Sequence, residues 1–119
     1  MEIIITDSKY IREVQEEFQK LFPYLKIEFF KSKKQSGKSI LKSQLIPGKT
    51  TIGTVSDIHH PGIINIDGSR SVDEIECDFQ NKFGLYAEVF RKSGGMWIET
   101  TLTHHWSLHR QNFEGQQMS

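Results

Sequence analysis

The sequence has a single cysteine and no excess charge of either sign. Its 15 Lys and Arg residues balance 15 Asp and Glu residues, so no net charge attracts the chain to nucleic acid or to an anionic membrane. Cys77 has no second cysteine with which to form an internal disulfide. No apolar run approaches the roughly 18 residues of a membrane-spanning helix. We therefore expect a cytoplasmic protein without a membrane partner.

The sequence also lacks a recognisable catalytic or phosphate-binding motif. Gly37-Lys38-Ser39 resembles the end of a phosphate loop, but Ser32 stands where that loop needs its first glycine. No serine lies in a G-x-S-x-G pattern, and no histidine is close to Cys77 in the sequence. These absences favour a protein without a cofactor over an enzyme.

The most informative positive feature is an internal similarity. At 119 residues and 36% hydrophobic residues, the chain has the size of one globular domain, over residues 1–119. Within it, residues 3–22 align with residues 64–83 without a gap, at an offset of 61. After a one-residue slip, residues 28–31 align with residues 88–91. Each copy, over about 2–31 and 63–92, is predicted to form a strand, a helix and a strand.

The two helices are predicted from apolar residues at helical spacing. Ser71 followed by Glu74 is typical of a capping box at the start of the second helix. Pro23 and Gly84 occupy equivalent stop positions. The buried stripes comprise Ile11, Val14, Phe18, Leu21 and Phe22 in the first helix, and Val72, Ile75, Phe79 and Phe83 in the second.

Two such βαβ units resemble the ferredoxin-like split-βαβ sandwich, an α+β fold with one antiparallel sheet and both helices on one face. Alternation predicts that a further edge strand, 96–101, follows a Ser93-Gly94 turn and places Val89 opposite Ile98 and Phe90 opposite Trp97. A short C-terminal helix is expected in the tail, 102–119.

The predicted sheet carries an aromatic-rich face that points away from both helices. Large exposed apolar patches favour association, so this face should be covered by the tail, by a second copy or by a ligand. The main prediction is therefore a small non-enzymatic binding or assembly module, whose partner is itself as a homodimer, another protein or a small molecule. The predicted binding face consists of Tyr24, Phe30, Asn65, Tyr86, Phe90 and Trp97.

A basic insertion, residues 32–62, separates the two copies. The chain has no acidic residue from Phe29 to Ser56, although Asp57 follows at once. Lysines on a Gly- and Ser-rich background can neutralise phosphates without reading a base sequence. An alternative function is thus nucleic-acid association through the Lys31–Lys49 region. The phosphate-contact candidates are Lys31, Lys33, Lys34, Lys38 and Lys42. The segment 50–55 is predicted to be extended.

Histidines provide a second alternative, a metal-dependent enzyme. His59 and His60 are adjacent, and His105 and His109 are four residues apart, which would place two imidazoles on one helical face. A site that combines the two groups would bind zinc or nickel, with an affinity that depends on pH because the ligands must be neutral.

Overall fold

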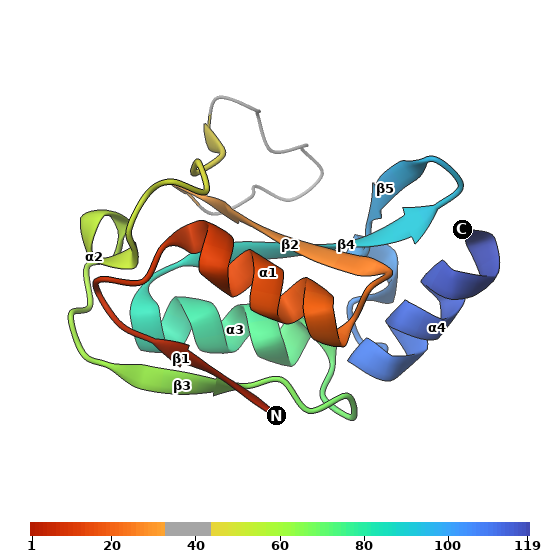
Figure 1. The fold of residues 1–119 in the computed structure, drawn as a ribbon. Coiled ribbons are helices and arrows are strands. Elements are labelled where there is room, and N and C mark those ends of the chain that lie inside the picture. Colours follow the sequence, from red (N-terminus) through yellow and green to blue (C-terminus); the bar gives the residue numbers. More distant parts are fainter. Residues whose placement is uncertain (33–43) are drawn as a thin grey trace.

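The computed structural model describes residues 1–32 and 44–119 of the chain. It is an α+β domain with two antiparallel sheets (Figure 1). In chain order the elements are β1 (Glu2–Ile5), α1 (Ile11–Leu21), β2 (Leu25–Phe30), α2 (Ile52–Val55), β3 (Gly62–Asn65), α3 (Val72–Phe83), β4 (Tyr86–Ser93), β5 (Met96–Glu99), a 3₁₀ turn η2 (Thr101–Thr103) and α4 (Leu108–Met118). No helix among these residues is long and apolar enough to cross a membrane.

The strands form two separate sheets, which corrects the prediction of one ferredoxin-like sheet. β1 pairs only with β3, and β2, β4 and β5 form a second sheet in that order. Figure 1 shows α1 and α3 lying between the β1–β3 ribbon and the larger sheet. β2 of the first βαβ unit therefore pairs with β4 of the second. A ferredoxin-like sheet would keep these two strands at opposite edges.

Basic side chains occupy the outer edges of the β1–β3 ribbon. The Lys9 ammonium donates to the Ile4 carbonyl at 2.6 Å, and the Arg70 guanidinium donates to the Asn65 carbonyl at 2.9 Å. Cationic donors at a strand edge satisfy backbone acceptors that a further strand would otherwise bind. The ribbon therefore ends at two strands.

Side chains from the helices also bond to the backbone of the larger sheet. Gln15 on α1 donates to the Ile27 carbonyl of β2 at 3.0 Å. Glu76 on α3 accepts from the Val89 amide of β4 at 3.0 Å. Helix side chains thus bond to backbone groups of β2 and β4 that the β2–β4 pairing does not use.

The helix stripes were predicted correctly except at one residue. The buried core takes its largest side chains from α1, α3 and the inner strand faces, and the Phe29 and Phe79 rings meet edge to face with centroids 5.1 Å apart. Leu21 is 41% exposed, because it lies in the last turn of α1. Nine pairs of buried residues recur at equivalent places: Ile3 and Ile64, Ile5 and Ile66, Ile11 and Val72, Val14 and Ile75, Phe18 and Phe79, Phe22 and Phe83, Leu25 and Leu85, Phe29 and Val89, Ile52 and Leu108.

Helix ends follow the predicted signals. The Ser71 hydroxyl accepts from the Glu74 amide, and the Glu74 carboxylate accepts from the Ser71 amide, at 3.1 Å each. Gly84 ends α3 with a φ of 63°, a left-handed conformation that glycine adopts without strain. α1 ends just before Pro23.

Two local predictions were wrong. The turn between β4 and β5 is Gly94-Gly95, so Phe90 pairs with Glu99 and Lys92 pairs with Trp97. This shift of two residues leaves Trp97 on the predicted face because side chains alternate with a period of two. The segment 50–55 contains α2 instead of an extended segment.

The similarity between the two copies continues beyond the aligned strands. The Ile11 amide donates to the Thr50 carbonyl at 2.9 Å, and the Val72 amide donates to the Trp106 carbonyl at 3.2 Å. Isolated bridges join Tyr10 to Thr51 and Ser71 to Ser107. Thus residues 48–53 and 104–109 hold equivalent places, with α2 corresponding to the first turn of α4.

Candidate binding face

The outer face of the β2–β4–β5 sheet carries aromatic side chains beside lysines. In the register, Phe30 lies opposite Tyr86, Lys26 opposite Phe90, and Lys92 opposite Trp97. Phe30 is only 6% exposed, while the other aromatic residues are partly exposed. We call the partly exposed set the lysine–aromatic face: Lys26, Tyr86, Phe90, Lys92 and Trp97.

Two lysine ammonium groups lie near the Trp97 ring. The Lys26 nitrogen is 5.5 Å from the centroid of that ring, and the Lys92 nitrogen is 5.0 Å from it. Lys26 is also 5.3 Å from the centroid of the Phe90 ring. These distances are within the range of cation–π attraction. The face therefore presents aromatic surface and positive charge together.

A groove of about 330 Å³ borders this face, along the outer edge of β2. Glu28 accepts from Gln15 at 3.1 Å and lies 3.5 Å from the Lys26 ammonium. The groove thus offers charges of both signs beside one aromatic wall. Its lining comprises Arg12, Gln15, Glu16, Gln19, Lys26, Ile27, Glu28 and Trp97.

The second tryptophan has similar neighbours. The guanidinium carbons of Arg91 and Arg110 lie 5.4 and 3.8 Å from the Trp106 ring centroid. Arg91 also donates to Gln111 at 2.8 Å, which fixes it against α4. Sequence reasoning missed this stack, because the contacts depend on how α4 packs.

Two further residues of the predicted binding face have other neighbours. Tyr24 directly precedes β2, and its carbonyl accepts from the Lys92 amide. The Tyr24 amide donates to Asn112 of α4, and a Cβ at Gly115 would lie 2.9 Å from the Tyr24 Cβ, so α4 packs closely against Tyr24. Asn65 belongs to the β1–β3 ribbon and accepts from the Asp67 amide. The prediction placed Asn65 beside the aromatic residues because it assumed a single sheet.

The lysine candidates are mostly outside the described residues. Lys31 is exposed just after β2, and its amide donates to the Gln44 carbonyl. Lys33, Lys34, Lys38 and Lys42 lie in the segment 33–43, outside the residues that the structure describes.

The four candidate histidines occupy separate surroundings. His59 Nδ1 is 3.0 Å from the Asp7 carboxylate, whereas the His105 ring contacts His104 and the His109 ring contacts Phe22. No three His, Cys, Asp or Glu side chains converge as a metal-binding group in the part of the chain that the structure describes. His60 belongs to no such group among the described residues. The metal-dependent enzyme stays a prediction.

A smaller pocket, of about 140 Å³, lies at the equivalent edge of the second copy. Glu88 is only 8% exposed there, and Thr100 donates to the Val89 carbonyl beside it at 2.7 Å. Sequence reasoning did not identify this pocket, since its residues are scattered along the chain. Three of its six lining residues are acidic. The lining comprises Asp73, Glu76, Glu88, Thr100, Thr101 and His104.

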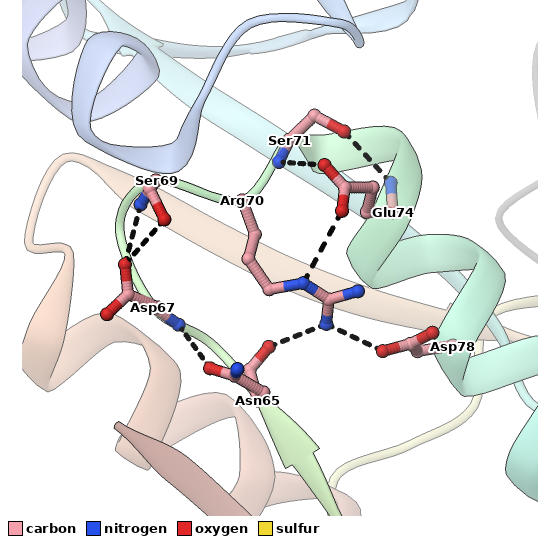
Figure 2. A network of polar contacts seen from close by, with 7 residues as sticks. All are labelled: Asn65, Asp67, Ser69, Arg70, Ser71, Glu74 and Asp78. Carbon is pink, nitrogen blue, oxygen red and sulfur yellow. Dashed lines mark hydrogen bonds and ion pairs between the residues drawn. The ribbon is translucent and has the colours of Figure 1, made fainter.

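The loop between β3 and α3 carries a dense polar network that is structural in character (Figure 2). Hydrogen bonds from the Ser69 amide and hydroxyl lower the pKa of Asp67, and hydrogen bonds from Ser71 lower the pKa of Glu74. The hydrogen bond to Asp78 raises the pKa of Arg70. Each of these charged side chains is bonded to nearby residues of the network, so the network fixes the conformation of the loop.

The ion pair at its centre has a counterpart in the first copy. Arg70 lies 2.6 Å from Asp78, and Lys9 lies 2.5 Å from Glu17. Arg70 and Asp78 each lie 61 residues after their counterparts, Lys9 and Glu17. A pair that recurs in this way fixes the strand-to-helix turn in each copy.

Comparisons with protein-family models, with curated proteins and with solved structures found no match for this chain.

Proposed function

We propose that this protein is a non-enzymatic binding module whose contact surface is the lysine–aromatic face, and that its ligand is a single-stranded nucleic acid. The proposal places the protein in the cytoplasm, as its single cysteine suggests. The observation that carries it is the closeness of the Lys26 and Lys92 ammonium groups to the Trp97 ring.

Single-stranded nucleic acids bind to surfaces that combine these two groups. Bases stack on aromatic rings, and lysines contact the phosphates that link those bases. The Lys26 and Lys92 ammonium groups lie within 5.5 Å of the Trp97 ring centroid, so a base that stacks on Trp97 would bring its phosphates within reach of both lysines.

The strand positions also support a nucleic acid. Tyr86 and Phe90 belong to β4, the central strand of its sheet, and RNA-binding sheets display their stacking aromatics on central strands. A ferredoxin-like sheet would have placed these residues on an outer strand, where they would match an RNA-binding sheet less well.

Fluorescence titration tests the proposal. An oligonucleotide of about 12 thymidines or uridines should quench tryptophan emission at low ionic strength. Replacing Lys26 and Lys92 with Gln should weaken binding and reduce the salt slope by roughly 1 to 1.5, because each phosphate contact contributes about 0.7 for a single strand.

A matched double variant controls for the loss of charge. Lys20 and Lys82 lie in the last turns of α1 and α3, away from this face. Their replacement with Gln removes the same charge and should leave the slope unchanged. Absence of binding by the unmodified protein at low salt would exclude the nucleic acid, as would equal effects of the two double variants.

A second candidate is self-association through the same face. Glu28 lies beside Lys26, and Glu99 lies opposite Phe90, so two copies can present opposite charges to each other. Under this candidate the protein sediments as a dimer at neutral pH, and Trp97→Glu returns it to a monomer. A monomeric unmodified protein would exclude it.

A further inference from the structure

The two halves of the chain are related by a local two-fold axis. In the β1–β3 ladder Ile3 pairs with Ile64, its equivalent at an offset of 61. In the β2–β4 ladder Glu28 pairs with Glu88, its equivalent at an offset of 60. An antiparallel ladder that pairs a residue with its own equivalent is centred on a two-fold axis. One axis through both pairs relates residues 1–61, the first half, to residues 62–119, the second half.

Both ladders join one half to the other. Neither half pairs β1 with β2 or β3 with β4 within itself. The nine pairs of equivalent buried residues named above place matching side chains on both sides of this boundary. The core of the protein is therefore an interface between two similar units, such as a homodimer would form.

Smaller contacts across the boundary also occur in pairs. The Ser56 hydroxyl, after α2, donates to the Phe83 carbonyl at the end of α3. Asn112, in the corresponding place of the second half, accepts from the Tyr24 amide after the end of α1, at 2.9 Å. Each half thus holds the helix end of the other half.

Only one connection, residues 57–61 between α2 and β3, joins the halves covalently. We propose that two copies of this chain exchange halves, so that the first half of each chain pairs with the second half of the other. Every ladder and core contact is retained in such a dimer, and only the path of the connection changes. Exchange of this kind costs little because the contacts are the same. It produces a molecule with two lysine–aromatic faces, each built from both chains, and does not depend on the proposed ligand.

Cysteine pairing across the β1–β3 ladder tests the exchange. Ile4 and Ile63 lie opposite each other and are 61% and 43% exposed, so their replacement spares the core. They form a non-hydrogen-bonded pair, whose Cα atoms lie about 4.5 Å apart, within the range of a disulfide. One chain would carry Ile4→Cys and the other Ile63→Cys, both with Cys77→Ser.

The two chains are unfolded together, refolded at high concentration in a thiol–disulfide buffer and separated on a non-reducing gel. Exchange predicts a covalent heterodimer in clear excess over both homodimers, because only exchanged chains place Ile4→Cys opposite Ile63→Cys. Mixing the chains after each has folded should give much less of it. A heterodimer yield no greater than the random proportion would overturn the proposal.

A shortened connection provides a second, independent measurement. Deleting His59 and His60 from the unmodified chain should prevent the two halves from meeting within one chain. Exchange then predicts a folded protein of twice the mass by sedimentation, with an unchanged circular dichroism spectrum. A folded monomer, or a chain that does not fold at any concentration, would contradict the proposal.

Discussion

Glu28 lies directly opposite Glu88 in the β2–β4 ladder. Like charges in this position repel each other, and the two side chains belong to cavities at opposite edges of the ladder. Glu28 lines the groove beside α1, where Gln15 and Lys26 contact it. Glu88 lines the acidic pocket beside α3. Equivalent glutamates of the two copies thus line two cavities that differ in charge.

The paired core predicts equal costs of truncation in the two copies. Phe18→Ala and Phe79→Ala should each reduce the free energy of unfolding by about 3 to 5 kcal/mol, since both side chains are fully buried. Urea unfolding followed by circular dichroism measures the loss. Phe113→Ala, on the exposed side of α4, should cost less than about 0.5 kcal/mol. A loss below about 1 kcal/mol at Phe18 or Phe79 would contradict the paired core.

Gly115 should be intolerant of any side chain. A Cβ there would lie 2.9 Å from the Tyr24 Cβ and 3.0 Å from the Tyr24 carbonyl oxygen. Because backbone cannot yield cheaply, Gly115→Ala should push α4 away from β2 and cost roughly 1 to 3 kcal/mol. Gly95→Ala is the control, since its Cβ would meet nothing within 4 Å. Equal melting temperatures for the two variants would show that α4 is not held against Tyr24.

Gln111 is fully buried and connects three groups. Its amide nitrogen donates to the Thr103 carbonyl and hydroxyl, and its oxygen accepts from Arg91. Gln111→Leu should remove these hydrogen bonds, leave the Arg91 guanidinium without its Gln111 acceptor and reduce the free energy of unfolding by about 1 to 3 kcal/mol. Freed from Gln111, Arg91 should also move relative to Trp106, which would alter tryptophan emission. An unchanged spectrum and stability would contradict this role.

Acid should weaken the cap of α3. The pKa of Glu74 is lowered from its usual value near 4.5 by the Ser71 hydrogen bonds, so the ionised carboxylate stabilises the folded state. This contribution is complete above the usual pKa and is lost as the pH falls through the lower pKa of the folded state. Glu74→Gln should therefore flatten the acid limb of stability against pH.

The control for this experiment is Glu2→Gln. Glu2 is an exposed carboxylate on β1 that accepts no hydrogen bond among the described residues. Thermal melts over a pH series compare the two variants with the unmodified protein. If both variants flatten the curve to the same degree, the effect reflects overall charge and the cap is not its source.

Local patterns were sufficient to predict α1, α3 and a C-terminal helix, the ends of α3 and the sidedness of the strands, but not α2. Apolar spacing identified the buried faces of α1 and α3 because a helix repeats every 3.6 residues. Ser71, Glu74 and Gly84 marked helix ends because capping involves only neighbouring residues. The register of β5 differs by two residues from the predicted one. Because side chains alternate with a period of two, Trp97 still lies on the expected face.

Tertiary structure decided which strands meet. Four side chains bond to the backbone of strands: Lys9, Arg70, Gln15 and Glu76. The sequence pattern around each of them does not specify which strand it contacts, so no local pattern reveals these bonds. The strand pairing places Asn65 on a different sheet from the aromatic residues and places β4 at the centre of the larger sheet. It also brings the Lys26 and Lys92 ammonium groups within 5.5 Å of the Trp97 ring centroid. The sequence alone therefore predicts which faces are buried, whereas the candidate site depends on strand partners distant in the chain.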